Sequence, residues 1–246
     1  MRVVAIIQAR LSSKRLPNKV LADLCGKPML WHIIERVKRA RLVDEVTVAV
    51  SSNEQDIEIQ NIIPSGIVMA VPKVDENDLI GRFYSVACDS WADLIVRICA
   101  DNPFVDPVEI DRAVDYYMDV PRVYVSNMHQ HHESCMISSG KNGYPDGIGC
   151  EVFSMSRLKW MHKTIKDAYQ REHPHYFFHA ASEISSPQCP SEISRPDLRL
   201  DINTQDDLDY VRSIYEIVYP KNPQFTTKEV IEAIDAHHLE RCPIPT

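Results

Sequence analysis

Glycine-rich phosphate-binding loops are absent from this sequence. Only 7 of its 246 residues are glycine, and it contains neither the Walker A pattern nor the GxGxxG pattern. Those patterns are typical of P-loop nucleotidases and of dinucleotide-binding domains, which wrap phosphates with backbone amides. The sequence therefore excludes both classes in their usual form. Any phosphate that this chain binds must be held largely by side chains.

Paired cysteines, long apolar runs and an excess of positive charge are also missing. The seven cysteines include no CxxC pair, and their odd number, with no secretory leader before the first strand, favours reduced thiols in a cytoplasm. No apolar run reaches the length of a membrane span. The net charge of −8 argues against a nucleic-acid partner. We expect a cytoplasmic protein that binds neither membranes nor nucleic acid.

The first half of the sequence alternates regularly between strand and helix patterns. Buried-type strands are predicted at 3–7, 45–50, 66–71 and 93–99, and helices at 28–40, 54–63, 79–91 and 106–117. The short connections favour a mostly parallel, doubly wound α/β sheet. Because 44% of the residues are hydrophobic and no internal repeat is present, we expect residues 1–246 to form a single domain.

The second half is less regular. Strands are predicted at 123–126, 147–153 and 198–202, and helices at 155–166, 169–181, 205–219 and 227–236. Residues 129–144 are polar and lack periodicity, so we expect an arm or insertion at roughly 128–182. Its His129, His131 and His132 lack the spacing of a helical zinc pair, and we reject a metal site there.

A cationic loop follows the first strand. Arg10, Lys14, Arg15 and Lys19 lie within a dozen residues of its end. A charge cluster of this kind is often a solvated surface turn. In doubly wound sheets, however, the loop after the first strand usually contacts phosphate, and arginine can bind phosphate oxygens bidentately. Its position therefore favours a polyphosphate site.

Two aspartates end predicted strands and are candidates for holding a divalent cation. Asp101 follows the strand at 93–99, and Asp201 closes LRLD. Aspartates at strand ends often only cap turns, but Mg²⁺ bound to a triphosphate typically needs one or two carboxylates. We expect Asp106 and Asp111 to be helix-start residues instead, and Asp206 and Asp207 to lie in the first turn of a helix.

The stretch IIQARLSSKRLPNKVLADLCGKPML resembles the N-terminal signature of the cytidylyltransferases that activate sugars and sugar acids with CTP. It is most similar to the spore-coat polysaccharide biosynthesis branch, which is related to the 3-deoxy-manno-octulosonate and acylneuraminate cytidylyltransferases. The matching residues are Gln8, Ala9, Arg10, Ser13, Arg15, Leu16, Pro17, Lys19, Gly26, Lys27 and Pro28. The sequence departs at Lys14 and at Asn18, where the family usually has glycine. Because asparagine tolerates positive φ, we expect the turn to survive.

The resemblance implies a Rossmann-like nucleotidyltransferase fold, similar to glycosyltransferase A, with a small dimerisation or substrate arm. It implies that CMP passes from CTP to a sugar or sugar-acid acceptor, such as a 2-keto-3-deoxy sugar acid, with release of pyrophosphate, in a homodimer that makes surface polysaccharide. The expected nucleotide-binding residues are Gln8, Ala9, Arg10, Ser13, Arg15, Lys19, Arg97 and Asp101, of which Arg15, Lys19 and Asp101 are expected to be catalytic. Asp101 and Asp201 are the expected Mg²⁺ ligands, by similarity to the family segments ADNPxxDP and RLDxxxxxDL.

The same resemblance implies an acceptor site. The SN pair, the YPxGxxxEVF element and the REH element of the spore-coat branch correspond to Asn127, Glu151, Arg171 and His173. The acceptor itself stays open, because a phosphorylated sugar or polyol fits as an alternative. A glycosyltransferase-like nucleotide-sugar binder is another alternative, although no DxD triplet lies near Asp101. A non-catalytic nucleotide sensor is a third, disfavoured by the two aspartates.

Overall fold

The fold is built on one seven-stranded sheet with the strand order β5-β4-β1-β6-β8-β7-β9. The computed structural model describes residues 1–119, 123–128, 142–174 and 184–241. The strands are β1 Val3–Ala9, β4 Glu45–Val50, β5 Val68–Ala70, β6 Leu94–Cys99, β7 Tyr124–Ser126, β8 Glu151–Ser154 and β9 Ile184–Ser185. A small hairpin pairs β2 Asp23–Leu24 with β3 Lys27–Pro28.

The sheet is mostly parallel, as the sequence predicted. β1 pairs in parallel with both β4 and β6, and β4 pairs in parallel with β5. Among the described strands, β8 alone runs against the others, because it is antiparallel to β6 and to β7. The carboxyl ends of β1, β4 and β6 therefore lie side by side at one end of the sheet, and the first residues of β8 lie at the same end. Doubly wound folds bind their ligands at the carboxyl ends of the parallel strands.

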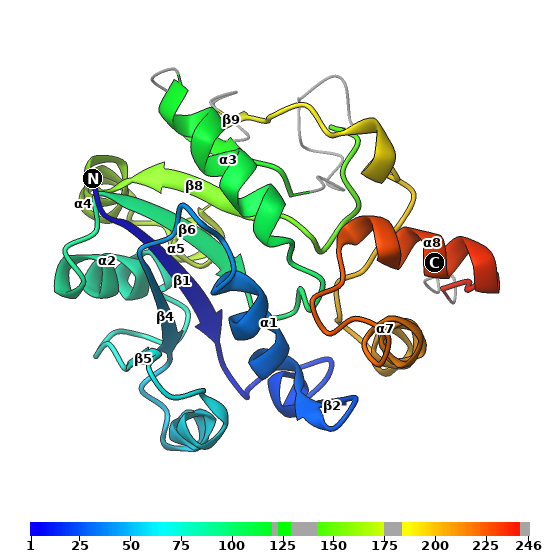
Figure 1. Cartoon of the computed structure of the whole chain (residues 1–246). Coiled ribbons are helices and arrows are strands. Elements are labelled where there is room, and N and C mark those ends of the chain that lie inside the picture. Colours follow the sequence, from blue (N-terminus) through cyan, green and yellow to red (C-terminus); the bar gives the residue numbers. More distant parts are fainter. Residues whose placement is uncertain (120–122, 129–141, 175–183, 242–246) are drawn as a thin grey trace.

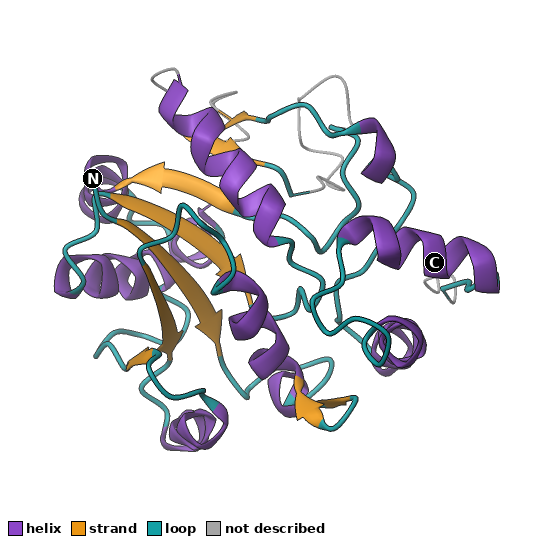
Figure 2. Ribbon diagram, viewed as in Figure 1, coloured by secondary structure: helices purple, strands orange, loops and turns teal. Residues whose placement is uncertain are grey.

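Helices cover both faces of the sheet (Figures 1 and 2). The α-helices are α1 Met29–Val37, α2 Leu79–Asp89, α3 Pro107–Asp119, α4 Met155–Thr164, α5 Ala168–Glu172, α7 Gln205–Val218 and α8 Thr227–His237. The 3₁₀ helices are η1 Lys19–Leu21, η2 Glu54–Ile62 and η3 Ser191–Ile193.

The apolar run of β1 explains why the sheet is buried on both faces. Alternate side chains of a strand point to opposite faces, so Val3, Ala5 and Ile7 join the larger core under α1, α3, α7 and α8. Val4 and Ile6 join a second, smaller core under α2 and α4. A run without polar alternation was therefore the correct indication of a central strand.

Two predicted elements and one predicted residue position differ in kind from the structure. Residues 54–62 form a 3₁₀ helix rather than an α-helix. Residues 198–202 are not a strand, because they make only an isolated parallel bridge between Asp146 and Arg199. Asp111 does not start a helix but lies within α3, where its carboxylate accepts hydrogen bonds from the backbone of Arg41 and Leu42 after α1.

The predicted arm lies partly outside the described residues, which exclude 129–141 and 175–183 and with them the three histidines. Its described part contains β8, α4 and α5, and β8 is an interior strand of the main sheet. The predicted helix at 169–181 is described only as far as α5 and its end. The part of the chain between 142 and 174 is therefore built onto the sheet rather than projecting as a separate unit.

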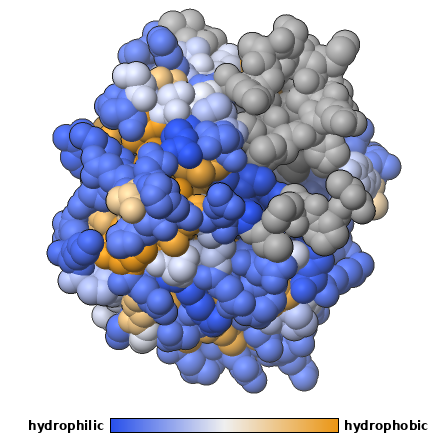
Figure 3. Space-filling view, turned by 90° about the vertical axis from the view of Figure 1, so that its right-hand side faces the viewer, coloured by the Kyte–Doolittle hydropathy of each residue, from blue (hydrophilic) through white to orange (hydrophobic). Residues whose placement is uncertain are grey.

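The described surface is charged and contains no long apolar helix. The face shown in Figure 3 is predominantly hydrophilic, with smaller apolar areas between the charged side chains. Within the described residues, no helix combines the length and the apolar character needed to cross a membrane.

Candidate functional site

A pocket of about 640 Å³ opens at the carboxyl ends of β1 and β6. Ligand sites of small molecules typically have volumes of about 300–1,000 Å³. Five segments line the pocket: the end of β1 with the loop after it, the start of α2, β6 with the residues after it, the end of α5, and the residues before α7. The lining residues are Gln8, Ala9, Arg10, Ser12, Ser13, Lys14, Arg15, Lys19, Val20, Glu76, Asn77, Leu79, Arg82, Arg97, Ala100, Asp101, Glu172, His173 and Asn203.

The loop after β1 is held in place by local contacts that its sequence provides. The backbone N–H of Leu11 donates to Oδ1 of the fully buried Asp56 at 2.7 Å, and Asn18 N–H donates to the Leu11 carbonyl at 3.0 Å. Asn18 has φ 59° and ψ 19°, so the left-handed turn that the family usually builds with glycine is present. The loop is thereby closed, and its cations face the pocket.

Lys19 and Asp101 both line the pocket and contact each other. Lys19 Nζ donates to Asp101 Oδ2 at 2.9 Å and to the Ile202 carbonyl at 2.8 Å. The backbone N–H of Ile202 donates to the Asp101 carbonyl at 2.9 Å. Both side chains are partly buried, with 13% and 30% exposed, and partial exclusion of water strengthens a charge-assisted hydrogen bond. Three segments that are distant in sequence are thus joined at one point.

Arg10 lies among acidic partners in the same pocket. Its guanidinium is 3.6 Å from Glu76 and 3.6 Å from Glu172, and it donates to Asn77 Oδ1 at 3.3 Å. Ser12 donates to the Glu76 carboxylate. That hydrogen bond, followed by one from Asn53, lowers the pKa of Glu76. Glu76 is therefore a carboxylate at neutral pH and holds Arg10 in place when no anion is bound.

Arg15 and Asn203 connect the loop to the segment before α7. Arg15 Nη2 donates to Asn203 Oδ1 at 2.6 Å, and Asn203 Nδ2 donates to the Asp201 carboxylate. Asp201 itself is not among the lining residues. It lies one hydrogen bond behind the pocket surface, where Arg199 and Arg241 also contact it at 3.2 and 3.3 Å.

Asp146 is a third carboxylate near this point. Burial raises the pKa of Asp146 to about 7, and the neighbouring carboxylates of Asp201 and Asp101 add to the shift. Within the described residues, no three His, Cys, Asp or Glu side chains are close enough to hold a metal ion by themselves. A cation bound here would therefore need oxygen ligands from a bound substrate, as Mg²⁺ on a triphosphate has.

Arg97 and Glu151 form a buried ion pair between β6 and β8. The two residues lie opposite each other on the paired strands, and Arg97 Nη1 donates a charge-assisted hydrogen bond to the Glu151 carboxylate. The Arg97 side chain is 7% exposed and the Glu151 side chain is 5% exposed. Arg97 Nε also donates to Gln8 Oε1 at 3.2 Å. Arg97 and Gln8 line the pocket, and Glu151 lies behind them.

The residues expected to bind the acceptor do not all meet. His173 lines the pocket, and its pKa is lowered by burial and by the nearby Arg97 and Arg10. Arg171 makes a bidentate pair with Asp78 at 2.8 and 2.9 Å, outside the set of lining residues. Asn127 is fully buried, donating to the Glu109 carbonyl and accepting from Cys150 N–H, both at 2.8 Å.

Several lining residues were not predicted from the sequence. Glu76 and Asn77 precede α2 and Arg82 lies within it, whereas Glu172, which ends α5, entered only as the middle residue of the REH element. They reach the pocket only because α2 and α5 pack together beside the end of β1. Asn203 lies two residues after Asp201, and this closeness to a predicted metal ligand was the one sequence feature that pointed to a place near the pocket.

The chain is similar in sequence to several known proteins. A sequence model of the family described as cytidylyltransferase matches residues 4–234. An uncharacterized protein of Methanocaldococcus jannaschii is 31% identical over 83% of this chain and 79% of its own. A 3-deoxy-manno-octulosonate cytidylyltransferase of Geobacter sulfurreducens is 37% identical over 52% of this chain, and the match spans 50% of that relative's length. The spore coat polysaccharide biosynthesis protein SpsF of Bacillus subtilis is 26% identical over 95% of this chain and 94% of its own.

Solved structures share the fold. A cytidylyltransferase from Leptospira borgpetersenii superposes with a TM-score of 0.86 at 24% identity, covering 100% of both chains. A CMP:2-keto-3-deoxy-manno-octonic acid synthetase complexed with CTP gives 0.60 at 17% identity, over 88% of this chain and 99% of that one. The protein Rv0371c of Mycobacterium tuberculosis, in complex with manganese, gives 0.59 at 14% identity, over 87% and 99%.

Proposed function

The chain belongs to the cytidylyltransferase family and is a nucleotidyltransferase, and we propose that it transfers CMP from CTP to a hydroxyl of a sugar or sugar acid. The observation that carries this proposal is that Arg10, Arg15, Lys19 and Asp101 line the same pocket. A hydroxyl oxygen of the acceptor forms a bond to the α-phosphorus of CTP. The bond from that phosphorus to the bridging oxygen breaks, pyrophosphate leaves, and the hydroxyl proton is released.

The side chains would contribute by positioning the substrates and by stabilising the negative charge on the phosphates. Arg10 and Arg15 would exchange their present partners, Glu76 and Asn203, for phosphate oxygens, which arginine binds bidentately. Lys19 supplies a fixed positive charge near the reacting phosphate, because two hydrogen bonds already hold its ammonium group. The backbone of Gln8 and Ala9 would lie near the base, and Ser13 would add a hydroxyl donor. No covalent protein intermediate is needed.

We propose that Asp101 and Asp201 hold a divalent cation, with Mg²⁺ as the expected ion. The donor set fits, since Asp101 lines the pocket and Asp201 contacts the lining residue Asn203, and two carboxylates plus phosphate oxygens suit magnesium. The manganese complex of a protein with the same fold supports use of a divalent ion. When bound, the cation neutralises charge on the triphosphate and on the leaving pyrophosphate.

The acceptor is proposed to lie near His173. Because its lowered pKa keeps the imidazole neutral at pH 7, His173 can accept a hydrogen bond from the acceptor's hydroxyl. Glu151 would act by holding Arg97 at the pocket, and Arg171 by fixing the start of α2 through Asp78. The named relatives act on 3-deoxy-manno-octulosonate or serve spore-coat polysaccharide synthesis, and both support a sugar-acid or polysaccharide precursor as the acceptor.

The test begins with the nucleotide. Thermal unfolding is measured with CTP, UTP, GTP and ATP, each with and without Mg²⁺. A ligand at a hundred times its dissociation constant stabilises the native state by about 2.7 kcal/mol. We expect a CTP-selective shift that Mg²⁺ increases, and Arg15→Ala should reduce it. Arg41→Ala, which removes an exposed arginine paired with Asp111 away from the pocket, is the control.

Acceptors are then compared by pyrophosphate release. The panel contains 3-deoxy-manno-octulosonate, a sugar phosphate and a polyol phosphate. Turnover of the sugar acid supports the proposal. Turnover of only a phosphorylated compound would mean that the acceptor is a sugar phosphate or polyol phosphate instead of a sugar acid. Absence of a shift with any triphosphate would overturn the nucleotide assignment as well.

The expected homodimer remains a prediction. Its support is the resemblance to the spore-coat branch, which implies a shared interface near residues 130–180. The molar mass from light scattering decides it: twice 28.2 kDa is expected, and a monomer at working concentration would contradict it.

A further inference from the structure

Arg241, which follows α8, is fixed by contacts to the segment that contains Asp201. Its Nη1 donates to the Arg199 carbonyl at 2.9 Å, and its Nη2 lies 3.3 Å from the Asp201 carbonyl. Its Nη1 is also 3.3 Å from Asp201 Oδ1, and its Nε donates to Asp207 Oδ1 at 2.9 Å. Only 13% of the Arg241 side chain is exposed. The guanidinium therefore joins two carboxylates and two carbonyls at once.

The contacts continue from Arg241 to the pocket. Asp207 Oδ2 accepts hydrogen bonds from the backbone N–H groups of Asn203 and Thr204, both at 2.9 Å, and completes the capping box of α7. Asn203 then contacts Asp201 with its amide nitrogen and Arg15 with its amide oxygen. A continuous set of hydrogen bonds thus runs from the end of α8 to the cationic loop after β1.

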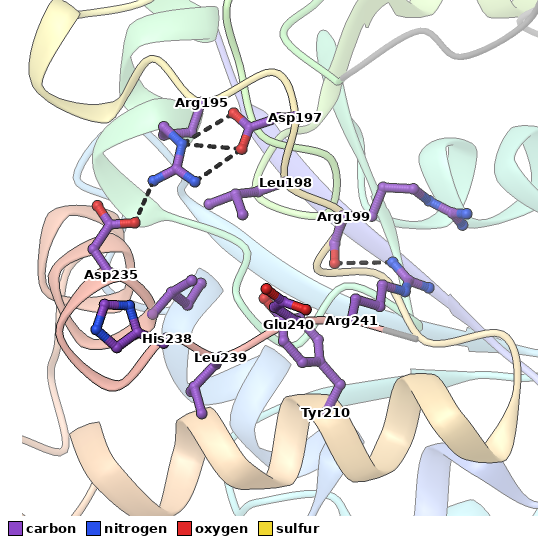
Figure 4. A pocket seen from close by; sticks show the side chains of 11 residues that line it. Arg195, Asp197, Leu198, Arg199, Tyr210, Asp235, His238, Leu239, Glu240 and Arg241 are labelled. Carbon is purple, nitrogen blue, oxygen red and sulfur yellow. Dashed lines mark hydrogen bonds and ion pairs between the residues drawn. The ribbon is translucent and has the colours of Figure 1, made fainter. Parts of the chain in front are cut away.

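A second arginine nearby provides an internal comparison. Arg195 and Arg241 both line a separate pocket of about 570 Å³ between α7 and α8, shown in Figure 4. Arg195 binds Asp197 and Asp235, at 2.8 and 2.7 Å. Figure 4 shows Arg195 on one side of this pocket, with Arg241 reaching the Arg199 carbonyl on the other. The two side chains have the same chemistry and neighbouring positions, but only Arg241 contacts the segment at 199–207.

We propose that Arg241 is a positioning residue that orients Asp201 and Asn203 toward the bound triphosphate and its cation. This inference rests on the proposed function, because it takes Asp201 as a ligand of the cation. A planar guanidinium with five donors is suited to fixing carbonyls and carboxylates together. Groups that orient metal ligands in this way typically contribute 10–100-fold to metal affinity or activity.

The experiment measures Mn²⁺ binding directly, from the electron paramagnetic resonance signal of free Mn²⁺, with the full chain in the presence of CTP. We expect Arg241→Met to weaken Mn²⁺ binding by about tenfold or more and to raise KM for CTP. The matched variant Arg195→Met should stay within about twofold, because its partners lie away from the 199–207 segment. Unchanged or tighter Mn²⁺ binding in Arg241→Met would overturn the inference, since Arg241 would then be inert or a competitor for Asp201.

Two further measurements separate the possible failures. If Arg241→Met does not fold, as judged by circular dichroism, Arg241→Lys decides, because it keeps the charge but loses the paired donors. Weakened Mn²⁺ binding in that variant supports the inference, and wild-type binding overturns it. If the wild-type chain itself binds no Mn²⁺ with CTP, the metal assignment and this inference both fail. Normal binding by the wild type and by every Arg241 variant overturns the inference alone.

Discussion

The buried pair of Arg97 and Glu151 allows a quantitative prediction. Replacing Glu151 by Gln keeps the shape of the side chain but leaves the Arg97 guanidinium, 7% exposed, without its counter-charge. Breaking one partner of a buried ion pair costs about 3–5 kcal/mol. Because Gln retains a hydrogen-bond acceptor, we expect the lower end, about 3 kcal/mol, which corresponds to a fall in Tm of about 6–12 °C for a chain of this size.

Urea unfolding followed by circular dichroism at pH 7.5 measures the effect, with two companion variants. Glu232→Gln breaks the exposed pair of Lys228 and Glu232, whose side chains are 3.8 Å apart and 60% and 63% exposed, and should change stability by less than about 0.5 kcal/mol. The double variant Arg97→Met with Glu151→Met removes both charges and should recover at least half of the loss. A loss of stability in Glu151→Gln no larger than that in Glu232→Gln would refute this prediction, and so would a double variant less stable than Glu151→Gln.

Three further predictions concern other contacts. Lys19→Met removes the charged hydrogen bonds to Asp101 and to the Ile202 carbonyl, and an interaction of this kind contributes about 1.5–3 kcal/mol. If the same charge acts on the bound triphosphate, kcat/KM measured by pyrophosphate release should fall about 10–150-fold. An unchanged kcat/KM would mean that Lys19 only supports the fold. Arg171→Met breaks the bidentate pair with Asp78 and should lower the urea midpoint, whereas an unaltered midpoint would leave this pair without a structural role. Burial lowers the pKa of His32, so its protonation opposes folding, and the stability present above pH 6.5 should be lost as pH falls further. His32→Gln keeps a donor for the Leu24 carbonyl and should lose less stability between pH 7 and 5; equal pH slopes would contradict this.

The sequence alone determined the features whose causes are local. The unbroken apolar run of β1 predicted a strand buried on both faces, because strand side chains alternate between faces and neither face was polar. Asn18 could be expected to take a left-handed conformation, and it does. A helix was predicted at 205–219 with Asp207 in its first turn, and α7 does start at Gln205, where Thr204 and Asp207 form a capping box that needs only these neighbours.

Tertiary structure alone decided which side chains meet. Asp201 was expected at the end of a strand, but its segment makes a single bridge, and Arg241, 40 residues away, contacts it instead. Arg171 was expected at the acceptor and is paired with Asp78, 93 residues away. Glu76 reaches the pocket through the packing of α2 against the sheet. Local patterns fix backbone conformation because hydrogen bonds and side-chain alternation act within a few residues. The pairing of charges depends on where separate helices pack, and the sequence near each charge does not encode that.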